Sequence, residues 1–204
     1  MTGLAAPHLV IDRFLGPAAA DSLLAQMIAS APRFTPSEVR QSSGGNVDAG
    51  YRSSLRLPGR IGVDLDPFKA AIHARFAELC AATGLPPFEI YHTECSVVAH
   101  GDGDFYRTHI DTRTGDPATR GRHIRLLSCV YYLNFEPPAF SGGELVLHKL
   151  GSADPAATIA PQHDRLAVFP SFIPHEVLPI ACPSRRFEDS RFSINCWLHR
   201  RVGQ

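Results

Sequence analysis

Apolar residues follow two patterns along the chain, and the change comes near residue 87. Before it, two stretches carry apolar side chains at helical spacing, one over 17–30 and one over 66–83. Pro17 suits the first turn of the first stretch, and Asp66 as N-cap followed by Pro67 suits the start of the second. Gly84, shortly before two prolines, predicts the end of the second helix.

After residue 87 the chain becomes a series of short runs rich in β-branched and aromatic residues, separated by Gly, Pro and Asp. The candidate strands cover 88–99, 105–110, 123–134, 143–149, 157–161, 165–170, 175–181 and 191–199. Helices followed by about eight strands predict a mainly β fold, a double-stranded β-helix (jelly roll) with the N-terminal helices packed on it.

Between the two helices, residues 33–60 are rich in Ser, Gly and Pro and predict a long irregular segment. Such a segment within a compact domain is either filler or a functional lid, and 51–54 would form the part that covers a substrate. We expect one domain over 1–204, with helical support and a lid loop in 1–87 and a jelly-roll catalytic core in 88–204.

Charge and cysteine content narrow the possible partners. Lys plus Arg equal Asp plus Glu at 20 each, which predicts neither nucleic acid nor an anionic membrane as partner. No apolar run approaches the ~20 residues of a membrane span, and residues 1–10 lack the layout of a secretory signal. The five scattered cysteines never form C-x-x-C, which favours a reducing, cytoplasmic compartment. Cys95, Cys129 and Cys196 lie in apolar runs and are interpreted as small core residues. The oligomeric state stays open.

The pattern His109-Ile110-Asp111 is the first candidate for chemistry. On a β-strand, residues 109 and 111 would point to the same face. With His175 from a later strand they would form two histidines and one carboxylate, which leaves half of an octahedron open, as non-heme Fe(II) oxygenases require. Because the chain holds ten histidines, H-x-D alone also fits a surface histidine near an aspartate.

The last candidate strand adds a second feature. Alternation places Arg191 on the same face as Ser193, Asn195 and Trp197. A guanidinium inside a barrel is costly unless it meets an anion, and a bidentate carboxylate is its usual partner. A dicarboxylate cosubstrate that chelates iron at one end and meets Arg191 at the other would explain this placement.

Several segments stand in a fixed order around these residues. They are Gly103-Asp104-Phe105-Tyr106, Tyr131-Tyr132-Leu133-Asn134, Ser141-Gly142-Gly143-Glu144-Leu145, 164–170, His175-Glu176-Val177, and Arg191 six residues before Trp197. From about residue 88 to 200, this order resembles the prolyl-hydroxylase branch of the 2-oxoglutarate/Fe(II) dioxygenases. The N-terminal half is similar only as helical support.

The resemblance implies His109, Asp111 and His175 as catalytic iron ligands, and Arg191 as the residue that binds the distal carboxylate of 2-oxoglutarate. Tyr132 would donate a hydroxyl hydrogen bond to the same carboxylate. Fe(II), 2-oxoglutarate and O2 are the implied cofactor and cosubstrates, with ascorbate as an optional addition. The Gly142-Gly143 turn is interpreted as a tight connection into a core strand.

Two positions depart from the family pattern. His100 stands about where prolyl hydroxylases often carry a tyrosine, and it is either a cosubstrate contact or a polar residue at a strand end. The segment 182–190 is longer than in compact members and brings Arg185 and Arg186 near the spacing of the family arginine. We prefer Arg191 for that role because its distance to Trp197 and its strand context match.

Three functions follow as hypotheses. The first is hydroxylation of a prolyl residue in a protein or peptide. The second keeps the chemistry but takes a small molecule, such as a free amino acid. The third is a non-catalytic metal-binding jelly roll that acts as a sensor, for which Arg191 and Tyr132 would have no purpose.

Overall fold

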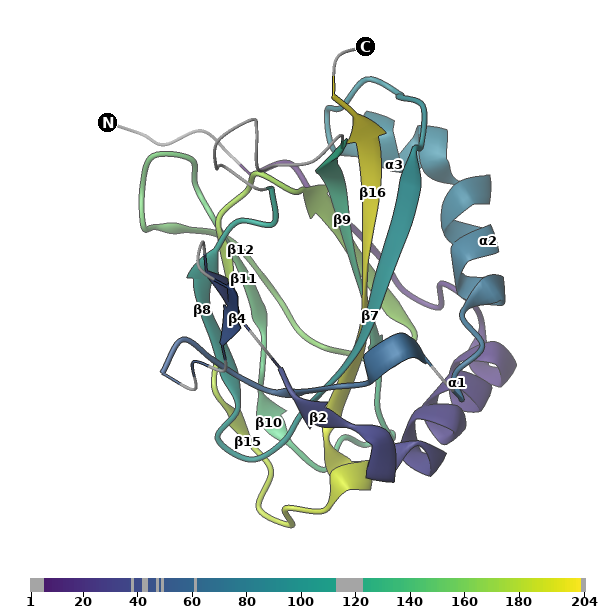
Figure 1. The fold of residues 1–204 in the computed structure, drawn as a ribbon, viewed down its shortest axis with the longest axis vertical. Coiled ribbons are helices and arrows are strands. Elements are labelled where there is room, and N and C mark those ends of the chain that lie inside the picture. Colours follow the sequence, from purple (N-terminus) through teal and green to yellow (C-terminus); the bar gives the residue numbers. More distant parts are fainter. Residues whose placement is uncertain are drawn as a thin grey trace.

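Two antiparallel sheets face each other, and helices pack against the outer side of the larger one (Figure 1). This computed structural model describes residues 6–202 apart from 38, 42–43, 47, 49, 61 and 113–122. Parts of the predicted segment 33–60, and most of the loop after Asp111, therefore lie outside the described residues.

The larger sheet has seven strands in the order β1-β13-β9-β16-β7-β6-β2. Their bounds are β1 Leu9–Ile11, β13 Arg165–Pro170, β9 His123–Leu133, β16 Arg191–Arg201, β7 His92–His100, β6 Leu55–Arg56 and β2 Thr35–Pro36. The smaller sheet has five, in the order β12-β11-β14-β8-β5. These are β12 Pro155–Ile159, β11 Leu145–His148, β14 His175–Val177, β8 Phe105–His109 and β5 Arg52–Ser53.

Short elements complete the fold. Two small ladders pair β10 (Ser141–Gly142) with β15 (Ile180–Ala181) and β3 (Val39–Gln41) with β4 (Gly44–Asn46). The α-helices are α1 Pro17–Ala29, α2 Asp66–Ala74 and α3 Phe76–Ala82, and 3-10 turns cover Ala31–Arg33, Pro58–Arg60 and Phe187–Asp189.

Alternation along β9 separates two hydrophobic cores. Tyr131 faces the helices and stacks on Phe68 of α2, with ring centroids 5.3 Å apart. Its neighbour Tyr132 points the other way, into the core between the two sheets. The helices thus cover one face of the larger sheet, while its inner face lines the space between the two sheets.

The jelly-roll prediction with supporting helices is confirmed, and all eight candidate strands occur. The stretch 175–181 divides into β14 and β15, and the first helix matches its predicted range within one residue. The second helix differs: Leu65 rather than Asp66 occupies the N-cap position, and Arg75 separates α2 from α3. No helix among the described residues is long and apolar enough to cross a membrane.

The expectation that 33–60 is irregular was wrong for much of its described part. β2 and β6 extend the edge of the larger sheet beside β7, and β5 pairs with β8 in the smaller sheet. Because these pairs join sequence-distant partners, the sheet edges rather than local apolar alternation stabilise them.

Candidate metal and cosubstrate site

His109 and His175 stand directly opposite each other on the neighbouring strands β8 and β14. Their ring centroids are 4.2 Å apart. Nδ1 of His109 lies 2.8 Å from the carbonyl oxygen of Arg107, and Nδ1 of His175 lies 2.9 Å from that of Ile173. A carbonyl oxygen only accepts, so each Nδ1 carries the proton and each Nε2 is left with a free lone pair.

Asp111 reaches the two imidazoles from a turn rather than from the strand, because β8 ends at His109. Its backbone N–H donates to the carbonyl of Ser171 (2.9 Å). The Ser128 hydroxyl on β9 donates to Asp111 Oδ2 at 2.7 Å and is itself 2.8 Å from Ser171 Oγ. Asp111 thus comes just after the end of the strand, and contacts with Ser171 and Ser128 orient its carboxylate.

The three ligand atoms converge. Asp111 Oδ1 is 3.9 Å from Nε2 of His109, Oδ2 is 3.5 Å from Nε2 of His175, and all three ligand atoms lie within 4.8 Å of one another. Burial, reinforced by the nearby His175, lowers the pKa of His109 to about 3. Burial alone would raise the pKa of Asp111, but His175, His109 and Arg125 lower it. A neutral His109 beside an ionised Asp111 is the combination that a divalent metal ion requires of these two ligands.

Arg191 lies further along the inner face of the larger sheet, where it is 1 % exposed and pairs in register with His100. Its guanidinium lies 4.8 Å above the Tyr132 ring, and Nη1 is 3.4 Å from His100 Nδ1. Among the described residues, Arg191 Nε and Nη2, Tyr132 Oη and His100 Nε2 are buried without a well-formed hydrogen bond. Burying a cation beside unpaired donors is costly, so this group fits an anion.

The protonation states of Tyr132 and His100 allow both side chains to donate hydrogen bonds to a ligand in this pocket. Burial raises the pKa of Tyr132 to about 12, so its hydroxyl keeps its proton. Burial and the nearby Arg191 and Arg52 charges lower the pKa of His100 well below its ordinary value. A neutral His100 that accepts at Nδ1 from Arg191 carries its proton on Nε2. All the unpaired atoms of the pocket are therefore donors, as a carboxylate requires.

The other candidate arginines lie outside this pocket. The Arg185 and Arg186 side chains are 79 % and 64 % exposed and pair with Asp102 and Glu188. The structure therefore places only Arg191 of these three in a buried position.

The stretch 51–54 packs on the strand that carries His109. The Tyr51 hydroxyl donates to the carbonyl of Thr108 (3.2 Å), and the Tyr51 ring lies edge-on to Tyr106. Tyr106 stacks on the His109 ring with centroids 3.6 Å apart, and the Arg52 guanidinium lies 4.7 Å from the Tyr106 ring. These contacts place 51–54 beside the metal-ligand cluster as part of the smaller sheet.

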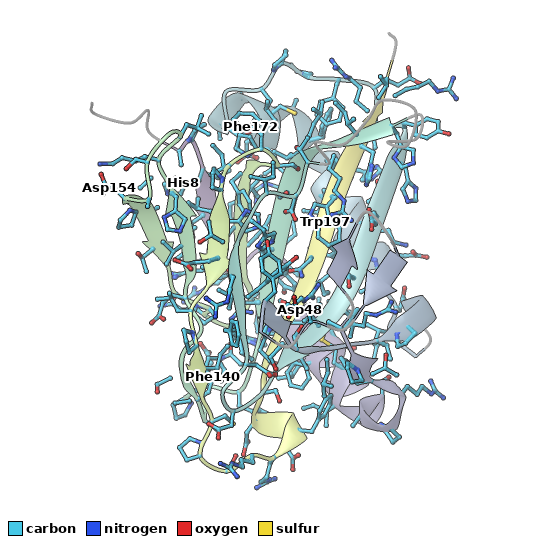
Figure 2. All side chains as sticks on the ribbon, turned by 60° about the vertical axis from the view of Figure 1, so that its left-hand side comes forward. His8, Asp48, Phe140, Asp154, Phe172 and Trp197 are labelled. Atoms are coloured by element: carbon cyan, nitrogen blue, oxygen red, sulfur yellow. The ribbon has the colours of Figure 1, made fainter. Side chains whose placement is uncertain are left out.

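Arg125 and Glu94 were not anticipated from the sequence. Arg125 on β9 makes a two-point hydrogen-bonded pair with Glu94 on β7 (2.7 and 3.0 Å) and lies 3.8 Å from the Trp197 ring centroid. Figure 2 labels Trp197 and shows it higher in the view than Phe140, which packs on Ile180. The inner face of the larger sheet thus runs from the Arg191 pocket to an Arg125–Trp197 pair.

Comparisons with known proteins agree with this geometry. The family model for the 2OG-Fe(II) oxygenase superfamily matches residues 95–199, about half of the chain. An uncharacterized PKHD-type hydroxylase of Synechocystis is 36% identical over 138 residues, which cover 64% of this chain and 44% of that protein. The matched segment thus spans less than half of this relative.

Solved structures share the fold at lower identity. A Pseudomonas putida prolyl-4-hydroxylase superimposes with a TM-score of 0.69 at 24% identity, covering 96% of this chain and 94% of its own. A Trichoplax adhaerens prolyl hydroxylase in complex with a hypoxia-inducible-factor peptide fragment gives 0.69 at 22% identity, covering 95% and 83%. A viral collagen prolyl hydroxylase from Paramecium bursaria Chlorella virus-1 gives 0.60 at 19%, covering 95% and 96%.

The family match falls on the segment that holds all three converging side chains and the buried Arg191 pocket. The chain therefore belongs to the 2OG-Fe(II) oxygenase superfamily.

Proposed function

We propose that the protein hydroxylates prolyl residues in a protein or peptide, with Fe(II) held by His109, Asp111 and His175. The observation that carries the proposal is a buried guanidinium on the larger sheet, for which the described residues provide no ion pair, together with a His-Asp-His cluster whose histidines lie on the smaller sheet. Fe(II) and 2-oxoglutarate supply the oxidising chemistry, in which O2 and decarboxylation to succinate drive hydroxylation of a substrate C–H bond.

The chain's own residues bind the cosubstrate and orient the metal ligands. Arg191, Tyr132 and His100 are assigned to the distal carboxylate of 2-oxoglutarate, because together they present only donors and no competing buried acid. Ser128 and the carbonyls of Arg107 and Ile173 fix the three metal ligands in one orientation. No side chain has to serve as a general base, since proton abstraction is not part of this chemistry.

The pairing of residues 51–56 with the two sheets favours a peptide substrate. Strand β5 forms the edge of the smaller sheet and β6 pairs with β7 in the larger sheet, so these two strands do not form a closed apolar cover over the metal ligands. The motif order resembles the prolyl-hydroxylase branch, and three solved structures with this fold carry prolyl hydroxylase in their names. A small-molecule substrate, such as a free amino acid, is the alternative that the test must separate.

The test has two stages. Anaerobic titration of the protein with Fe(II) and 2-oxoglutarate should give a weak visible charge-transfer band that vanishes in His109→Ala. Succinate release should then be screened over proline-containing peptides and free amino acids. Release with peptides alone supports the proposal, release with a free amino acid alone supports the small-molecule alternative, and neither band nor succinate would overturn both.

A further inference from the structure

Arg125 lies between two carboxylates that differ in role. Its Nη2 is 2.7 Å from Glu94 Oε1 and its Nε is 3.0 Å from Glu94 Oε2, while its Nη1 is 3.9 Å from Asp111 Oδ1. Oδ1 is the same oxygen that lies 3.9 Å from Nε2 of His109. A small displacement of the guanidinium would therefore turn this loose 3.9 Å contact with the metal-ligand carboxylate into a hydrogen-bonded ion pair.

Such an ion pair would compete with a metal ion. A carboxylate oxygen engaged by a guanidinium offers less electron density to a metal, and the positive charge repels a divalent cation at close range. For Asp111 Oδ1 to serve as a metal ligand, the guanidinium must therefore stay clear of it.

Glu94 and Trp197 together restrain the guanidinium. Trp197 provides a flat face 3.8 Å away, and Glu94 takes up its donors in a two-point geometry. Glu94 is itself fixed, because Nε2 of His199 lies 3.0 Å from its Oε2. Trp197 and Glu94 are also directly opposite in the pairing of β16 with β7, so one ladder position sets both contacts.

We propose that Glu94 is a positioning residue for metal binding: it retains Arg125 on Trp197 and so leaves the Asp111 carboxylate available to the metal ion. This inference rests on the proposed function, since it takes the His109–Asp111–His175 cluster as the metal site. It assigns a role to an ion pair that touches neither metal nor cosubstrate.

The experiment is a double-mutant cycle on the metal-free full chain, titrated with Mn(II) in a calorimeter. Glu94→Gln keeps the shape of the side chain but loses its charge, and Mn(II) affinity should fall about tenfold or more. Arg125→Gln removes the competitor. In that background, Glu94→Gln should change affinity by less than about twofold, since the effects of a coupled pair are not additive.

The single tryptophan gives a second readout without metal. Emission from Trp197 should change in Glu94→Gln, because the guanidinium leaves the indole. The matched control is Glu78→Gln on α3, which removes a carboxylate from the two-point pair with Arg75 (2.9 and 2.7 Å) and should leave both readouts unchanged. Circular dichroism identifies any variant that fails to fold.

Two results would overturn the inference: an unchanged Mn(II) affinity in Glu94→Gln, or an equal loss with and without Arg125. Failure of the proposed function would look different. There the wild-type chain would bind no Mn(II), or binding would persist in His109→Ala.

Discussion

Gly143 lies so close to the side chain of Arg191 that a larger residue at position 143 would force neighbouring side chains to move. A Cβ at position 143 would be 2.7 Å from Arg191 Cδ and 3.2 Å from its Nε. Gly143 also has a φ of +71°, in the left-handed region that favours glycine. The Gly-Gly turn, which the sequence suggested was only a tight connection, therefore also provides the space in which the buried arginine is extended.

Gly143→Ala should displace Arg191 and weaken 2-oxoglutarate binding by about 10–100-fold, the cost of disturbing a hydrogen bond to a charged group. The measurement is succinate formation as a function of 2-oxoglutarate concentration. Gly151→Ala is the matched control, since Gly151 has a φ of +77° but nothing within 4 Å of its Cβ position. Equal KM increases in both variants would show that backbone strain, not contact with Arg191, is responsible.

Arg191→Lys should also raise the KM for 2-oxoglutarate, by about 10–100-fold, because an ammonium group cannot reproduce the planar two-point geometry of a guanidinium. Metal affinity should be unaffected. Arg185→Lys serves as control, since Arg185 is exposed and bonded to Asp102. If Arg185→Lys raised the KM and Arg191→Lys did not, the cosubstrate assignment would have to move to the 182–190 segment.

Ser128→Ala removes the hydroxyl that donates to Asp111 Oδ2. The carboxylate then loses a fixed orientation, and metal affinity should fall about tenfold, as for other residues that orient ligands. Calorimetric Mn(II) titration measures the loss. Ser184→Ala deletes a comparable 2.7 Å hydrogen bond to Asp189 in the 182–190 segment and should bind Mn(II) like the wild type.

Stability should depend on pH through Glu94. Burial would raise the pKa of this carboxyl, but hydrogen bonds from His199 and Arg125 outweigh burial and lower it to about 2 from 4.5. A carboxyl whose pKa falls on folding stabilises the protein above the unfolded value, and this contribution is lost as the pH drops through the folded value. The advantage of wild type over Glu94→Gln should therefore be full above about pH 4.5 and shrink toward pH 2.

Because the Glu94 side chain is 37 % exposed, screening limits this difference to on the order of 1 kcal/mol. Urea unfolding of both proteins across this pH range provides the measurement. A difference that stayed constant from pH 7 to pH 2 would contradict the assignment of the pKa to Glu94.

Local signals explain which parts of the fold were predictable. Alternation and turn residues mark the strands after residue 87, and Pro17 marks the start of α1. The break between α2 and α3 has no such signal, because Arg75 is neither glycine nor proline. Its side chain is held by a pair with Glu78 and lies 5.8 Å from the Phe14 ring, which is a tertiary contact.

The candidate site likewise contains residues that sequence motifs predict and residues that no local signal marks. His109, Asp111, His175 and Arg191 stand in motifs, and the structure brings the first three together, while their roles stay predictions. Glu94 and Arg125 are 31 residues apart on strands that do not pair directly. Only the register of β7, β16 and β9 brings them together, and register is not visible in a chain with balanced, scattered charges.

Strand β16 sets the distance between two parts of the candidate site. Arg191 begins it and Trp197 stands six positions further along the same face, so a single extended segment fixes a span of about 20 Å between them. A side-chain substitution changes the chemical group at one position of this strand. A one-residue shift of register would turn every inward side chain of the strand toward the helices, so that Arg191 and Trp197 would leave the inner face together.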